Sequence, residues 1–132
     1  MAIKRPPISD AERAVLKILW DLDHGTVREI HEALSKTGHE WNRSTVITLL
    51  QRLEKKRYVV SDKSGFAFVF RAAVSREDVL HQRMTVLAQE LSDGEAAPLV
   101  LAFAKRHKFT DEEIEQFRKA LDSMDPKRTR RR

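Results

Sequence analysis

Basic side chains gather between residues 43 and 63, where only Glu54 and Asp62 carry the opposite charge. Lys and Arg side chains pair with phosphate oxygens, and such contacts supply much of a protein's affinity for DNA. A run of like charge is also typical of an ordinary solvated surface, so the fold around it has to decide between the two interpretations. The six basic residues are Arg43, Arg52, Lys55, Lys56, Arg57 and Lys63.

Polar side chains that can read bases fall in the same stretch. Val46, Leu49, Leu50 and Leu53 recur at the spacing of one helix face and predict a helix whose other face points outward. Arg can pair with guanine, Gln with adenine, and an apolar side chain can meet the methyl group of thymine. The outward face comprises Arg43, Ser44, Ile47, Thr48 and Gln51, with Thr45 and Arg52 at its edges.

Three of these residues have a second interpretation that the sequence leaves open. Ser44 and Thr45 stand where the helix begins, so their hydroxyls can cap it as well as bind DNA. Ile47 can equally be a tolerated apolar residue on the surface. Arg28, at the start of an earlier expected helix, is a further candidate for phosphate, because the N–H groups there also favour anions.

The charge of the chain is distributed unevenly. Residues 1–72 carry 13 Lys and Arg against 9 Asp and Glu, a net charge of +4. Residues 73–125 carry 7 against 11, a net charge of −4, and residues 126–132 carry 5 basic residues and no acidic one. A basic first half favours a polyanionic partner.

The sequence argues against catalysis, a bound metal and membrane insertion. It has no cysteine, and its five histidines form no metal-ligand pair at helical spacing. It has no phosphate-binding glycine loop or nucleophile elbow. The longest apolar run, residues 99–104, is far shorter than the ~20 residues of a transmembrane helix, and no apolar signal-peptide core begins the chain. We therefore expect a cytoplasmic protein that is not an enzyme and has no cofactor.

Three short helices are expected before the end of the basic run. The segments Ser9–Glu12 and Thr26–Glu29 are capping boxes that open the first two, and Asn42 or Ser44 caps the third. Gly25 is expected to end the first helix. The buried face of that helix is expected to comprise Val15, Leu16, Ile18, Leu19 and Leu22.

The apolar pattern then changes from the period of a helix to that of a strand. Residues 58–61 favour a strand, residues 62–65 a turn, and alternation over residues 66–71 a second strand that begins at Phe66. Three helices followed by a hairpin is the order of a winged helix-turn-helix, whose recognition helix enters the major groove of DNA. Lys63 then lies at the tip of the wing, within reach of the DNA backbone or minor groove.

Only helices are expected beyond Ala73, and each carries an apolar seam. Isolated helices of this length are marginal in water, so the seams need a surface to pack on. Two chains can supply it to each other as a homodimer, or the seams can fold back on the first domain of a monomer. The seam residues are Leu80, Met84, Leu87, Leu91, Leu99, Phe103, Ile114, Phe117 and Leu121.

The predicted fold class is mainly α-helical with a small β-hairpin wing. We expect a winged helix-turn-helix DNA-binding domain at residues 1–73 and a helical dimerisation domain at residues 74–125. A basic, disordered tail is expected at residues 126–132.

Pieces of a known pattern run in order along residues 8–124. They are Ile8–Glu12, Ile18–Trp20, Val27–Ile30, Ser44–Leu53, Gly65–Phe70, Val74–Asp78, Leu99–Phe103 and Thr110–Ile114. In this order and spacing they make the chain resemble the penicillinase-repressor and methicillin-resistance-repressor (BlaI/MecI) family of bacterial transcriptional regulators. The resemblance implies a homodimer that represses genes by occupying operators of dyad symmetry.

The resemblance also implies a route of release. Several members of the family lose repression when a membrane sensor-protease leads to cleavage in the C-terminal region. The corresponding bond here joins Ala102 to Phe103, and Ala102 stands where cleavable members have Asn. Two other departures are Ile47, where Lys or Arg is usual, and Arg57, which replaces a common Gly. A copper-responsive branch uses a cysteine-rich site, which this chain lacks.

A winged helix can instead serve as a module for protein–protein assembly, since a fold does not determine a function. The basic outer face of residues 43–52, which bears Thr and Gln, favours DNA over that alternative. We therefore expect double-stranded operator DNA and a second copy of the chain as partners. A membrane sensor-protease is a further expected partner, with repression relieved by proteolysis in a response of the β-lactam type.

Overall fold

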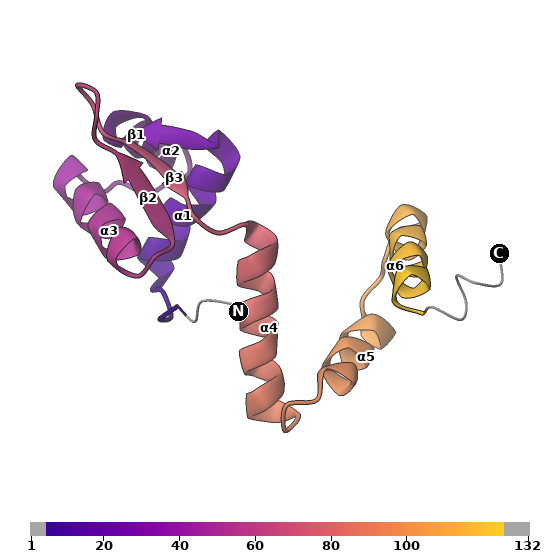
Figure 1. Ribbon diagram of the computed structural model, residues 1–132. Helices are drawn as coiled ribbons and strands as arrows, with labels where there is room; N and C mark the ends of the chain where they lie inside the picture. The colour runs from indigo at the N-terminus through magenta and orange to yellow at the C-terminus, as the bar shows by residue number, and fades with distance from the viewer. Residues whose placement is uncertain (1–4, 126–132) are drawn as a thin grey trace. The chain divides into compact units, whose positions relative to one another are not determined.

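The computed structural model describes residues 5–125, which fall into two units divided after Arg83 (Figure 1). The first unit holds a helical layer, a small sheet and the start of α4; the second holds the rest of α4 and two further helices. The elements are α1 (Asp10–Leu22), β1 (His24–Thr26), α2 (Val27–Lys36), α3 (Arg43–Lys55), β2 (Val59–Asp62), β3 (Val69–Ala72), α4 (Arg76–Leu91), α5 (Ala96–Arg106) and α6 (Asp111–Met124). The predicted fold class is confirmed, while the tail expected at 126–132 lies outside the described residues.

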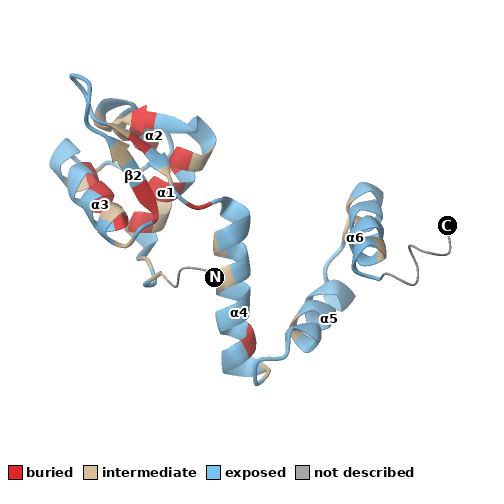
Figure 2. Cartoon of the chain, viewed as in Figure 1, coloured by how far each residue is buried: buried red, intermediate tan, exposed pale blue. Residues whose placement is uncertain are grey.

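The core of the first unit is one apolar cluster between the helices and the sheet, drawn red in Figure 2. Leu22, which the pattern placed in it, is 39% exposed, because it lies in the last turn of α1 beyond the core. The buried residues are Val15, Leu16, Ile18, Leu19, Ile30, Leu34, Val46, Leu49, Leu50, Leu53, Tyr58, Val59, Phe70 and Val74.

The helix starts follow the sequence pattern more closely than the helix ends. Both expected capping boxes form, and Asn42 rather than Ser44 caps α3. The expected end of α1 at Gly25 is wrong, because Asp23 takes a left-handed conformation (φ 72°) directly after Leu22. Gly25 lies in β1, where a Cβ would stand 3.3 Å from Ile30 Cγ1, so close packing rather than helix termination explains the glycine.

The sheet has the order β1-β3-β2 and is antiparallel throughout. The second wing strand begins at Val69, which pairs with Asp62, and not at Phe66 as expected. Phe66 and Phe68 are exposed, because within residues 5–125 their alternation meets no core beyond this pair. The pattern also did not indicate β1, which has three residues.

The helices of the second unit keep most of their apolar seams exposed in a single chain. Between α5 and α6, Phe109 packs against His107 and edge-on against Phe117, with ring centroids 4.6 and 4.7 Å away. The exposed seam residues are Leu80, Met84, Leu87, Leu91, Phe103, Ile114, Phe117 and Leu121; Leu99 is half-buried.

Candidate DNA-binding surface

Helix α3 is held by its apolar face, and its polar face is left outward. Val46, Leu50 and Leu53 are buried against α1 and α2, so residues half a turn away point to solvent. The predicted outward residues Arg43, Ser44, Ile47, Thr48, Gln51 and Arg52 are all exposed, and Thr45 is half-buried. The structure therefore brings these predicted site residues onto one surface.

The start of α3 separates the capping residue from the candidate base contacts. Asn42 Oδ1 accepts from the Thr45 backbone N–H (2.9 Å) and from the Ser44 hydroxyl (2.8 Å). The Thr48 hydroxyl donates to the Ser44 carbonyl (3.0 Å). Each of these hydroxyls keeps its acceptor lone pairs, so Ser44 and Thr48 can still accept a hydrogen bond from a base.

The basic residues around α3 differ in what they are free to bind. Lys56, included above among the phosphate candidates, instead bonds Glu12 Oε1 at 2.9 Å and is largely covered. Lys56 is therefore engaged within the chain, which counts against it as a phosphate contact. Lys55 and Arg57 are exposed, and Arg57 has the left-handed conformation (φ 71°) that glycine often adopts after a helix, which fits its place where Gly is common in the family.

The wing begins beside α3. Lys63 Nζ lies 4.0 Å from Glu54 of α3 and 5.7 Å from the centre of the Phe68 ring, and its side chain remains mostly exposed. Asp62 accepts from the backbone N–H and hydroxyl of Ser64, and these bonds lower the pKa of Asp62. The apolar pattern did not indicate that Phe66 is fully exposed at the wing tip. The signal for this is its place directly after Gly65, which marks it as a tip residue.

The N-terminus of α2 is less open to anions than expected. Thr26 and Glu29 occupy each other's backbone N–H groups, and these bonds hold the pKa of Glu29 below its ordinary value. Arg28 is exposed and lies 3.3 Å from Glu32 one turn later. Arg28 remains the candidate phosphate contact at this end of α2.

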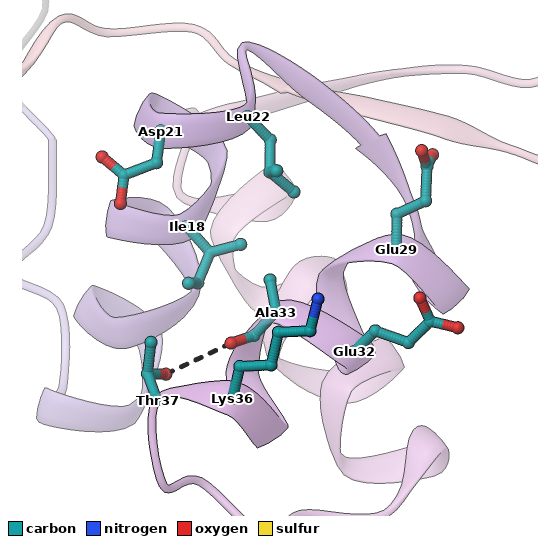
Figure 3. A pocket seen from close by; sticks show the side chains of 8 residues that line it. All are labelled: Ile18, Asp21, Leu22, Glu29, Glu32, Ala33, Lys36 and Thr37. Atoms are coloured by element: carbon teal, nitrogen blue, oxygen red, sulfur yellow. Dashed lines mark hydrogen bonds between the residues drawn. The ribbon is translucent and has the colours of Figure 1, made fainter.

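A depression between α1 and α2 has the opposite charge to α3 (Figure 3). Asp21, Glu29 and Glu32 stand around it, and Lys36 is the basic residue among the described residues that line it. Arg28 lies 3.3 Å from Glu32 and Arg76 lies 3.4 Å from Asp21, so the acidic charge of this lining is partly balanced by neighbouring arginines. The floor is apolar and comprises Ile18, Leu22 and Ala33.

Within residues 5–125, no group of three or more His, Asp or Glu side chains is arranged to hold a metal ion. Among these residues, no helix is long and apolar enough to cross a bilayer.

Comparisons with known proteins agree on one family. The model of the penicillinase repressor family matches residues 8–123. The chain is 30% identical to the penicillinase repressor of Bacillus licheniformis over 119 residues, which cover 90% of this chain and 92% of that protein. It is 32% identical to the transcriptional regulator BlaI of Mycobacterium tuberculosis over 120 residues, which cover 89% and 85%.

A solved structure matches part of the chain. The DNA-binding domain of the repressor BlaI covers 58% of this chain and 93% of its own length, with 36% identity and a TM-score of 0.51. On the family match along nearly the whole chain and on this shared domain, the protein belongs to the penicillinase repressor family of DNA-binding transcriptional repressors, which are not enzymes.

Proposed function

We propose that this repressor binds an operator of dyad symmetry as a homodimer, with α3 of each chain in the major groove. The observation that carries the proposal is the exposed polar face of α3, whose apolar face is fully used by the core. Residues 1–73 then form the DNA-binding domain and residues 74–125 the dimerisation domain. The partner is double-stranded DNA, and the site of action is the cytoplasm.

The proposed contacts divide into two kinds. Arg52 lies at the edge of the outward face of α3, and Lys63 lies in the wing. Together with Arg28 they contact phosphates, which gives affinity without sequence preference. Ile47 is placed to meet a thymine methyl, because it is the apolar member of an otherwise polar face. The base-reading residues are Arg43, Ser44, Thr45, Ile47, Thr48 and Gln51.

The apolar seams of α4, α5 and α6 form the proposed dimer interface. Phe103 and Phe117 remain large exposed aromatic surfaces in a single chain, and burying them against a second copy is favourable. The other proposed interface residues are Leu80, Met84, Leu87, Leu91, Leu99, Ile114 and Leu121.

One selection experiment tests this function against assembly with another protein. The full chain is incubated with a library of randomised inverted repeats, and bound duplexes are sequenced while sedimentation measures the mass in solution. A repressor of this kind enriches an inverted repeat with half-sites about 10–10.5 base pairs apart, or a multiple of that, and sediments as a dimer. A module for protein assembly enriches no sequence, and a monomer with full operator affinity contradicts the dimer.

Release by a membrane sensor-protease is proposed at the Ala102–Phe103 bond. Both residues are exposed, but the bond lies inside α5, so a protease must first unwind that helix. Cutting there divides the dimerisation domain and removes an avidity that can reach a factor of about 10²–10⁴. The mass of the protein in its host under β-lactam stress checks this: a fragment ending at Ala102 supports cleavage, and an intact repressor that leaves DNA refutes it.

A further inference from the structure

Three consecutive carbonyl oxygens ahead of α1 each accept a hydrogen bond from a different side chain. Gln82 Nε2 of α4 donates to the first (3.2 Å), and the Tyr58 hydroxyl donates to the second (2.6 Å). Lys56 Nζ, at the end of α3, donates to the third (3.0 Å). We call this segment, Arg5–Pro7, the N-terminal strap.

The composition of the strap suits it to a rigid link. Pro6 and Pro7 have fixed φ angles and no backbone N–H, so the bonds from Tyr58 and Lys56 to their carbonyls are the backbone hydrogen bonds open to them. Arg5 adds a bond from its Nε to the Arg57 carbonyl (2.8 Å), and its guanidinium lies 5.9 Å from the centre of the Tyr58 ring. The strap thus joins the end of α3 to α4 through short contacts on both sides.

The first turns of α4 are tied to the same unit at a second place. Trp20 Nε1 donates to the Val74 carbonyl (2.9 Å), just before α4. Arg76 lies 3.4 Å from Asp21 and over the Trp20 ring, and Val79 packs against the core. The start of α4 is therefore tied to the first unit, in agreement with the division after Arg83.

Gln82 lies on a different side of α4 from the apolar seam. It stands two residues from both Leu80 and Met84, which is about 200° around a helix. The same helix therefore presents one side to the strap and the other to a partner chain.

We propose that Gln82 and the N-terminal strap are positioning residues that hold the direction of α4 against α3 and so set the half-site spacing that the repressor accepts. The proposal rests on the proposed function, because spacing has meaning only for a dimer on two half-sites. One base pair added at the centre of an operator moves a half-site by about 3.4 Å and turns it by about 34°. A firmly held α4 resists that displacement, whereas a loosened α4 follows it.

The test compares operator spacings in the full chain. The probe is the inverted repeat selected by the wild type, the same duplex with one central base pair inserted or removed, and a duplex with a single half-site. Gln82→Ala and Tyr58→Phe each remove one donor to the strap, and Tyr58→Phe keeps the buried ring. Gln89→Ala is the matched control, because Gln89 is exposed and lies seven residues further along the same side of α4.

We expect the wild type and Gln89→Ala to discriminate strongly between spacings. Loss of one neutral hydrogen bond shifts an equilibrium by about fivefold, so Gln82→Ala and Tyr58→Phe should discriminate about three- to fivefold less. Binding to the single half-site should stay within about twofold, since α3 itself is untouched. In free protein, amide hydrogens of residues 76–83 should exchange faster in Gln82→Ala than in the control.

Three results overturn the reasoning at different points. Unchanged discrimination in both strap variants refutes the positioning role. An equal loss on every duplex with a lowered Tm makes these residues merely structural and refutes it too. A wild type that enriches no inverted repeat refutes the proposed function itself, before any variant is compared.

Discussion

Replacing Lys56 by Met removes the cation that faces a buried carboxylate. Glu12 is 2% exposed, and its Oε1 accepts from the Ser9 backbone N–H (2.8 Å) and from Lys56 Nζ (2.9 Å). Its Oε2 is buried and accepts no hydrogen bond from the described residues. Met keeps most of the apolar stem of Lys56, so the change removes the charge together with the hydrogen bond from Lys56 Nζ to the Pro7 carbonyl (3.0 Å).

The cost follows from the burial of the two partners. Breaking a fully buried ion pair on one side costs about 3–5 kcal/mol, because the other charge stays desolvated. The Lys56 side chain is 28% exposed, so water can partly replace it. We therefore expect the free energy of unfolding to fall by about 2–3 kcal/mol at neutral pH.

The effect should depend on pH in one direction. Burial raises the pKa of Glu12, but the Ser9 N–H and Lys56 together outweigh it and hold the pKa below its ordinary value of 4.5. A carboxyl with a lowered pKa stabilises the fold above pH 4.5, and this stabilisation is lost as the pH falls through the folded value. The difference between wild type and Lys56→Met should therefore be full near pH 7 and shrink in acid.

Urea unfolding followed by tryptophan fluorescence measures this in the full chain, because Trp20 and Trp41 both lie in the first unit. The exposed neighbour provides the control: Lys55→Met should change stability by less than about 0.5 kcal/mol. The double variant Glu12→Gln, Lys56→Met should cost less than Lys56→Met alone, since Gln keeps the capping bond without the charge. Two results would contradict this role of Lys56. One is a loss of unfolding free energy in Lys56→Met no larger than that in Lys55→Met, and the other is a loss that does not change with pH.

Three further results are expected. Leu50→Ala, at a fully buried site of α3, should lower the free energy of unfolding in urea by about 2–5 kcal/mol. Gln51→Ala should change base preference at one operator position by about 1–3 kcal/mol in competition binding. Arg52→Ala should instead weaken binding to all sequences. It should also reduce the slope of log affinity against log salt concentration by about one for each phosphate that the variant leaves unpaired. Phe117→Asp should sediment as a monomer and bind a single half-site as wild type does, because the charge falls in the proposed interface and far from α3 in sequence.

Features set by neighbours in sequence were predictable. A capping box needs two residues three positions apart, and the buried face of α3 needs a repeat of three and four, so both can be found without knowing the fold. The outward face of α3 follows from the buried one. The order of three helices followed by a hairpin also came from the pattern, and it is that of the structure apart from the short strand β1. The family resemblance is confirmed by the match over residues 8–123.

Features set by distant contacts were not predictable in the same way. Lys56 resembles its neighbour Lys55 in the sequence, and what separates them is Glu12, 44 residues earlier. The alternation through Phe66 and Phe68 is that of a strand, but a strand needs a covered face, and the wing tip has none. A basic run or an apolar alternation therefore gives the chemistry of a segment and not its partner.

The boundary of the DNA-binding part illustrates the same point at the scale of a domain. The change from hairpin to helix at Ala73 is the clearest break in the pattern, yet the contacts that hold the start of α4 come from Trp20, Asp21 and Arg5, which lie 54, 55 and 77 residues away from their partners. No periodicity links such positions. A fragment ending at residue 73 would keep every predicted base contact and lose the helix that these contacts orient. The positioning role proposed above therefore predicts that affinity for one half-site and selectivity for the spacing of two are encoded in different residues.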